Sequence, residues 1–260
     1  RSNEYGFYTR NMIKLIMRSL RSFVIVFAFC LTLLVTFLLS PSLLYAHQTE
    51  YKNFTIYHHQ ELDADLECII DRSLVTIADS ELHGVAFHSD LCLNDGSSYP
   101  RLVQKVLGDD VFTAFSNKIV VLGEPTGTFN QFEQWGQTLN YDQFLSHAAL
   151  HNLQFRHHGL FDANPLGRHP HWKWEGYVEY EVLGKDRELT KLIELLEAAP
   201  KEDFAWIELS NNEQIVRLHL QYLIWTKYCF EVLGMDYDLF MMDERSSEEI
   251  EVSLKVWFVE

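Results

Sequence analysis

The longest hydrophobic segment of the chain lies near its beginning. From Phe23 to Leu39 no residue is charged, and only two threonines interrupt the apolar side chains. Such a run is at the lower end of the length that spans a bilayer as a helix, and it exceeds the apolar region of a typical signal peptide. The pattern therefore predicts a signal-anchor or signal peptide over residues 22–46. An uncleaved anchor is favoured, because Leu44 is a poor residue at the third position before a cut after Ala46.

The rest of the chain alternates between strand-like and helix-like patterns. Strands are predicted within 84–93 and within 117–127, where Ile119–Leu122 is continuously apolar and Gly123 and Pro125 break the run. Helical spacing of apolar residues predicts helices over 61–80, 98–108, 141–157, 172–184, 187–198, 210–233 and 246–259. We expect Asp142 to cap the predicted helix at 141–157 and Ser246 or Ser247 to cap the last one. A small sheet followed by a helical half indicates an α+β domain.

Composition and charge indicate on which side of the membrane this domain lies and which class of ligand it does not bind. The chain is 47% hydrophobic and 14% aromatic, which is enough for a large core. Residues 1–21 hold five of the 21 basic side chains and one of the 37 acidic ones, so residues 22–260 carry 16 basic and 36 acidic groups, a net charge of −20. Basic residues before the apolar segment predict a cytoplasmic N-terminus and an extracytoplasmic domain at 47–260. So acidic a domain repels phosphate backbones, which argues against nucleic-acid binding.

The cysteines leave two alternatives open. Outside the cytoplasm Cys68 and Cys92 could form one disulfide, with Cys229 left over. Three buried free thiols are an equally good interpretation, because unpaired cysteine behaves as a small apolar residue.

Candidate chemistry begins with two histidines. His147 and His151 are four residues apart in a predicted helix, so both imidazoles can face one metal ion. Twelve histidines in the chain make a chance pair on a helix surface the main alternative. A carboxylate on the next predicted helix, Glu175, strengthens the metal hypothesis, because two histidines and one carboxylate are a common catalytic zinc set. The predicted strand at 117–123 could lie at a sheet edge and pair with an extended peptide.

The order of these elements resembles a known family. The strand "NKIVVLGEP", the helix "LSHAALHNLQF" and the segment "WKWEGYVEY" are similar to the gluzincin zinc metallopeptidases, which combine H-E-x-x-H with W-x-x-E-G-x-x-x-Y. The resemblance covers residues 117–184. Its second motif is the more specific one. The matching residues of that motif are Trp172, Trp174, Glu175, Gly176 and Tyr180.

The resemblance implies a zincin-like α+β fold and a role for each motif residue. His147, His151 and Glu175 would bind zinc, and Glu179 would support a ligand or replace Glu175 if the register is shifted. Tyr222 or Tyr228 would hold the oxyanion. The residues of the strand that would bind a peptide substrate are Ile119, Val120, Val121, Leu122 and Gly123.

The chain departs from the family at the position after the first histidine, where Ala148 replaces the glutamate. That glutamate is the general base, and general acid–base catalysis contributes about 10²–10⁴-fold to the rate. Glu133, Asp142 or Glu179 could supply a base only if the fold brings one of them to the ion. A second metal or proton site is conceivable at His157, His158, His169 and His171, although solvated loop residues are the simpler interpretation.

Three hypotheses follow from the sequence. The leading one is a membrane-tethered or exported pseudo-peptidase that binds one zinc ion and a peptide or protein partner. The second is an active zinc peptidase with a displaced base. The third is an extracytoplasmic structural domain that binds no metal.

Overall fold

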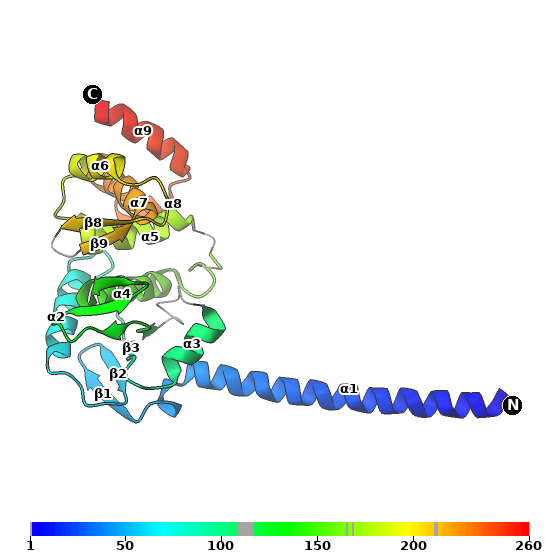
Figure 1. Cartoon of the computed structure of the whole chain (residues 1–260). Helices are drawn as coiled ribbons and strands as arrows, with labels where there is room; N and C mark the ends of the chain where they lie inside the picture. Colours follow the sequence, from blue (N-terminus) through cyan, green and yellow to red (C-terminus); the bar gives the residue numbers. More distant parts are fainter. Residues whose placement is uncertain (1, 109–116, 165, 168, 211–212, 260) are drawn as a thin grey trace.

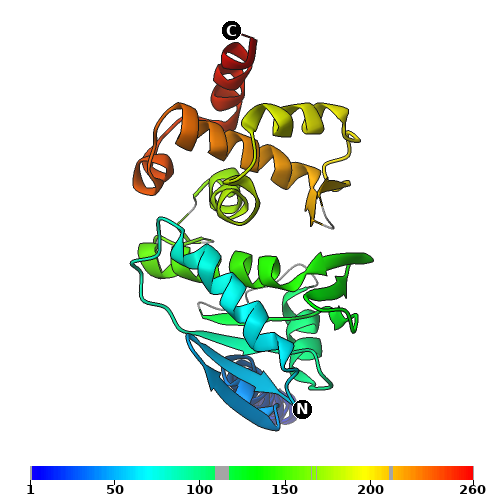
Figure 2. The same cartoon turned by 90° about the vertical axis from the view of Figure 1, so that its left-hand side faces the viewer.

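The structure is a computed structural model, and it describes residues 2–108, 117–164, 166–167, 169–210 and 213–259. A long helix, α1 (Ser2–Leu39), extends away from a body in which small sheets and helices are mixed (Figure 1). The body has two stacked halves, and α4 faces α5 across their boundary (Figure 2). The predicted α+β class is therefore confirmed.

Helix α1 contains the predicted hydrophobic segment. Leu20–Leu39 has a mean hydropathy of 2.7, and only 6% of it is buried. Twenty helical residues rise about 30 Å, which matches the thickness of the hydrocarbon core of a bilayer. This helix is long and apolar enough to be a signal or a membrane anchor. The short 3₁₀ turn η1 (Pro41–Leu43) follows it.

The main sheet has the strand order β1-β2-β3-β4. Its strands are β1 (His47–Tyr51), β2 (Phe54–His58), β3 (Ser89–Cys92) and β4 (Lys118–Val120). β1 and β2 form an antiparallel hairpin, whereas β3 runs parallel to both β2 and β4. The predicted strand after residue 117 is thus confirmed as an edge strand, although it is shorter than expected. The β1–β2 hairpin was not predicted, because β1 is polar and exposed along almost its whole length.

Two helices connect the parallel strands, and a second small sheet precedes the histidine helix. α2 (Asp65–Ala78) joins β2 to β3, and α3 (Tyr99–Leu107) follows β3. β5 (Glu124–Pro125), β6 (Gln131–Gln134) and β7 (Gln137–Asn140) form the second sheet. α4 (Tyr141–His158) follows β7 and ends at Gly159, whose φ of +78° is readily adopted by glycine.

The predicted cap of α4 is wrong. Asn140 is the N-cap residue, and Asp142 lies inside the first turn. Its Oδ1 accepts hydrogen bonds from the Gln143 backbone N–H and from Asn130 Nδ2. Asp142 therefore ties α4 to the β5–β6 connection, which a local capping pattern does not reveal.

The second half is mostly helical. Its elements are α5 (His171–Glu179), the π-helical turn η2 (Tyr180–Gly184), α6 (Leu189–Ala198), β8 (Trp206–Ser210), β9 (Glu213–Val216), α7 (Arg217–Lys227), the π-helical turn η3 (Tyr228–Val232), α8 (Tyr237–Met242) and α9 (Ser247–Val259). The predicted helix start at 210 is wrong, because a β8–β9 hairpin, buried through Ile207 and Ile215, precedes α7. The cap of α9 is confirmed: Glu249 N–H donates to Ser246 Oγ, and Ser246 N–H donates to Glu249 Oε2.

The cysteines do not form the disulfide considered above. Cys68 is exposed on α2, Cys92 is buried in β3, and both are free thiols, as are Cys30 and Cys229. An exposed and a buried cysteine on separate elements have no reason to pair.

Candidate metal site

The two histidines project from the same face of α4. The Nε2 atoms of His147 and His151 are 3.1 Å apart, and their ring centroids are 4.8 Å apart. Leu145, Ala149 and Leu153 lie on the opposite side of the helix and are fully buried in the core. The helix is therefore fixed by its apolar face, and the imidazoles are left partly accessible.

Glu175 of α5 completes the group. Its Oε2 lies 3.1 Å from Nε2 of His151 and 3.6 Å from Nε2 of His147. All three side chains are mostly buried, with exposed fractions between 12% and 18%. The connection at 159–170 returns the chain so that α5 lies against α4, as the sequence interpretation required.

The spacing of these three atoms fits a tetrahedral ion. Zinc–nitrogen and zinc–oxygen bonds of about 2.0–2.1 Å at tetrahedral angles place ligand atoms about 3.3–3.4 Å apart. The three separations here, 3.1, 3.1 and 3.6 Å, bracket that value. His147, His151 and Glu175 could therefore hold a metal ion, and they are the group with such spacing among the described residues.

Electrostatics favours a charged carboxylate at this place. Burial acts to raise the pKa of Glu175, but the charge of His151 and hydrogen bonds from both histidines outweigh it and hold the pKa well below its usual value. Burial acts to lower the pKa of His151, and here the attraction of Glu175 is stronger, so the net shift is upward. A divalent cation requires the ionised carboxylate that the lowered pKa of Glu175 provides, and its binding would displace the proton that the raised pKa favours on His151.

Both histidines are oriented through their second ring nitrogen. Nδ1 of His151 lies 2.9 Å from Oε1 of Gln154, whose Nε2 donates to the carbonyl of Trp174. Nδ1 of His147 lies 3.6 Å from Oε1 of the buried Glu179. A hydrogen bond like that of His151 fixes the tautomer and ring orientation of a metal-binding histidine, whereas the contact of His147 with Glu179 is electrostatic at this distance. Both Nε2 atoms are thereby left to converge on Glu175.

Glu179 is a supporting residue in this geometry and not a replacement ligand. Its Oε1 is 2.7 Å from Nδ1 of His219 on α7, and it meets His147 at the ring nitrogen remote from Glu175. Gln154 and His219 were missed by the sequence reasoning. Gln154 could have been found from its position three residues after His151, whereas His219 lies 40 residues beyond its partner and no local pattern indicates it.

Close packing of α5 on α7 explains the glycine after Glu175. A Cβ atom at Gly176 would lie 2.3 Å from Oγ1 of Thr226 and 2.8 Å from the backbone oxygen of Tyr222. Only a residue without a side chain allows this approach. The glycine therefore sets the distance between the helix that carries Glu175 and the helix that carries His219.

No carboxylate replaces the missing glutamate among the described residues. Ala148 is fully buried. Glu133 is exposed on β6, Asp142 is engaged at the start of α4, and Glu179 is engaged by His219. The site thus has a candidate ligand set without a candidate base in the position that hydrolysis needs.

The two tyrosine candidates have different environments. The Tyr222 ring is 6.0 Å from that of His219 and 5.8 Å from that of His171, and burial together with the charge of Glu175 raises its pKa. Tyr222 therefore borders the site. Tyr228 is a core residue whose ring packs on Trp257, so the oxyanion role does not fit it.

The predicted peptide-binding strand is largely enclosed. The side chains of Ile119, Val120 and Val121 are buried, and Asn94 Nδ2 donates to the carbonyls of Leu122 and Gly123. Among the residues that the structure describes, no strand pairs with the outer edge of β4, where a strand could be added.

The four histidines considered for a second metal or proton site do not converge on one point. His157 pairs with Asp238, and His158 lies 2.9 Å from the Tyr237 hydroxyl. The rings of His158 and His169 pack at a tilt, with centroids 4.5 Å apart, whereas Nε2 of His171 lies 3.7 Å from Oε1 of Glu175. The second metal site considered from sequence is not formed by the described residues.

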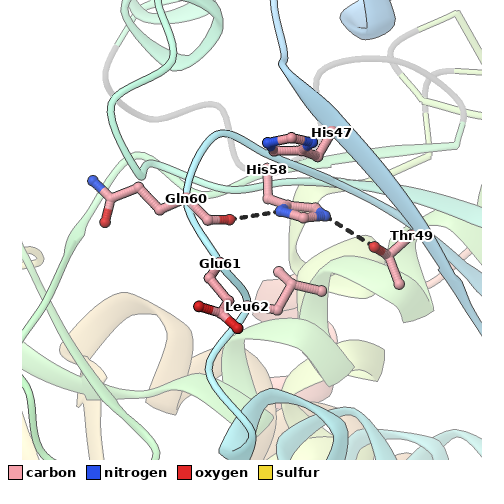
Figure 3. Close-up of a pocket in the computed structure, with 6 residues that line it drawn as sticks. All are labelled: His47, Thr49, His58, Gln60, Glu61 and Leu62. Carbon is pink, nitrogen blue, oxygen red and sulfur yellow. Dashed lines mark hydrogen bonds between the residues drawn. The ribbon is translucent and has the colours of Figure 1, made fainter.

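An open hollow of about 400 Å³ lies elsewhere on the molecule (Figure 3). It is lined by His47, Thr49, His58, Gln60, Glu61 and Leu62, and none of the predicted site residues takes part. His58 is fixed there by Thr49 and by the carbonyl of Gln60. Among the residues that line the hollow, Glu61 is the one with an acidic side chain (Figure 3).

Comparison of the chain with models of known protein families gave no match, and neither did comparison with curated proteins or with solved structures. The resemblance to gluzincins therefore rests on the sequence pattern of residues 117–184, which covers β4, α4 and α5.

Proposed function

We propose that this chain is a membrane-tethered, gluzincin-like domain that binds one zinc ion through His147, His151 and Glu175. The observation that carries the proposal is the convergence of these three side chains at tetrahedral ligand spacing, with both histidines supported at Nδ1. Two imidazoles and one carboxylate suit zinc better than calcium or magnesium, which take mainly oxygen ligands.

The domain acts as a peptide- or protein-binding module rather than as an efficient peptidase. A bound zinc ion would supply Lewis acidity and an acidic bound water. None of the described side chains is placed to accept a proton from that water, because Ala148 occupies the position of the base, Asp142 and Glu179 are engaged elsewhere and Glu133 is exposed on β6. Tyr222 borders the site, and we expect it and the free edge of β4 to contact a bound peptide.

The tether is α1, retained as an uncleaved anchor. Leu38 and Tyr45 are buried in a cluster with Tyr99, and removal of residues up to Ala46 would expose that cluster. The retained segment therefore stabilises the domain as well as attaching it.

Binding without cleavage is tested with the full chain in detergent, loaded with zinc and incubated with a mixture of peptides. Mass spectrometry of the retained and free fractions is expected to show peptides that are enriched on the protein and intact. Efficient cleavage of the peptides would favour a displaced base. Equal peptide retention with and without zinc would show that the metal plays no part in peptide binding.

A further inference from the structure

The body has a distinct surface around the point where α1 leaves it. We propose that this surface, formed by α3 and by residues 159–164 and 166–167 of the α4–α5 loop, lies on the bilayer that α1 enters and contacts anionic lipid headgroups. The inference rests on the proposed anchoring role of α1, and it goes further by giving the domain a fixed face toward the membrane.

The first observation is that α1 is joined firmly to the body. The Tyr99 hydroxyl donates to the carbonyl of Leu38 at 2.7 Å, and Ser97 Oγ donates to the carbonyl of Leu44 at 2.9 Å. Leu34, inside the candidate span, packs with the same cluster as Leu102. A membrane span joined to the body by these contacts does not act as a flexible linker. The side of the body next to α1 is therefore held near the bilayer surface.

The second observation concerns the exposed face of α3. Tyr99 and Val103 are buried against the body, whereas Arg101, Lys105 and Val106 are exposed. Arg101 and Lys105 are one turn apart and share a face. Residues 22–260 carry a net charge of −20, so two cations beside an apolar side chain next to the anchor are unusual for this domain. Basic and apolar side chains together suit the interfacial layer of an anionic membrane.

The third observation is the α4–α5 loop. Figure 1 shows this loop, between α4 and α5, on the side of the body from which α1 extends. Leu160, Phe161 and Leu166 in this loop are 57%, 79% and 58% exposed. Three large apolar side chains exposed on one loop are costly in water, and insertion into the interfacial region of a bilayer removes them from it.

The consequence concerns the metal site. The loop connects the helix of His147 and His151 to the helix of Glu175. If the loop is seated on the bilayer, the site lies close to the membrane surface, and its peptide partner would be a membrane-proximal segment.

The test uses the full chain in lipid nanodiscs of phosphatidylcholine and phosphatidylglycerol, with Cys30→Ala and Cys68→Ser; the other two cysteines are buried. A nitroxide is attached after Phe161→Cys, or after Val75→Cys as the control. Val75 is 62% exposed on α2, which lies on the opposite side of the body from α1 in Figures 1 and 2. Electron paramagnetic resonance then compares collisions with oxygen, which partitions into lipid, and with a water-soluble nickel chelate.

The label at position 161 is expected to show a several-fold higher oxygen-to-nickel ratio than the label at 75, and the paired change Arg101→Glu with Lys105→Glu is expected to lower it. Equal ratios at the two positions would overturn the inference and leave the loop free for a protein partner. A ratio unaffected by the paired change would overturn the role of α3. A chain that does not enter the nanodisc would refute the anchor itself, whereas its zinc content would still report on the metal site.

Discussion

The imidazole of His219 lies 2.7 Å, through its Nδ1, from Oε1 of Glu179. Glu179 in turn approaches Nδ1 of His147, so a residue of α7 supports a candidate ligand on α4. Burial alone would lower the pKa of His219, but its hydrogen bond and attraction to Glu179 raise it. This chain of contacts ties three helices to the candidate metal site.

Loss of this support is expected to weaken zinc binding without abolishing it. His219→Ala or Glu179→Gln should lower zinc affinity about 10–100-fold, because residues that orient ligands typically contribute that much. Competition with a chromophoric chelator measures the affinity. His83→Ala, a change of an exposed histidine on the loop after α2, is the matched control. Unchanged affinity in both site variants would show that the contacts play no part in metal binding.

A glutamate at position 148 is expected to increase the rate of peptide hydrolysis. Ala148→Glu should bring peptide hydrolysis up by as much as about 10²–10⁴-fold over the wild-type chain, the range that general acid–base catalysis contributes. Ala148→Gln is the matched control, since it places a similar volume at the same fully buried position without a base. Both variants are expected to lose stability. Fluorogenic peptides report the rate, and equal rates in the two variants would mean that more than the base is missing.

The glycine between α5 and α7 is expected to be sensitive to a single methyl group. Gly176→Ala should destabilise the domain by about 1–3 kcal/mol, the usual cost of overpacking, because the added atom meets the Tyr222 backbone. Gly84→Ala is the control, since a Cβ atom there meets nothing within 4 Å. Urea unfolding followed by tryptophan fluorescence gives both values. A loss no larger at 176 than at 84 would contradict the close packing of the two helices.

His158 is expected to make stability depend on pH. Burial lowers its pKa to about 4, and the charges of His169 and His157 act in the same direction. The unfolded chain takes up this proton near pH 6.5, so the neutral side chain contributes stability that is complete above pH 6.5 and is lost as the pH falls toward 4. Thermal unfolding midpoints should fall over this range by less in His158→Gln than in the wild type. An equal fall in both chains would argue against the lowered pKa.

Local patterns were sufficient for part of the fold and for the grouping of His147, His151 and Glu175. The i, i+4 spacing of His147 and His151 depends only on helix geometry, and the motif around Glu175 indicated the second helix. Hairpins were missed where the strands are polar, as in β1, because an exposed strand has no apolar alternation to detect. His219 could not be predicted, since its contact with Glu179 depends on how α7 packs on α5, and that packing is decided by tertiary contacts such as the one at Gly176.

The most direct test is the metal content of the full chain, purified in detergent without chelator and measured by inductively coupled plasma mass spectrometry. We expect one zinc ion per chain, its loss in His147→Ala and in Glu175→Ala, and its retention in His83→Ala. A wild-type chain that contains no zinc and takes up none when it is added would contradict the proposal that these three residues form a metal site.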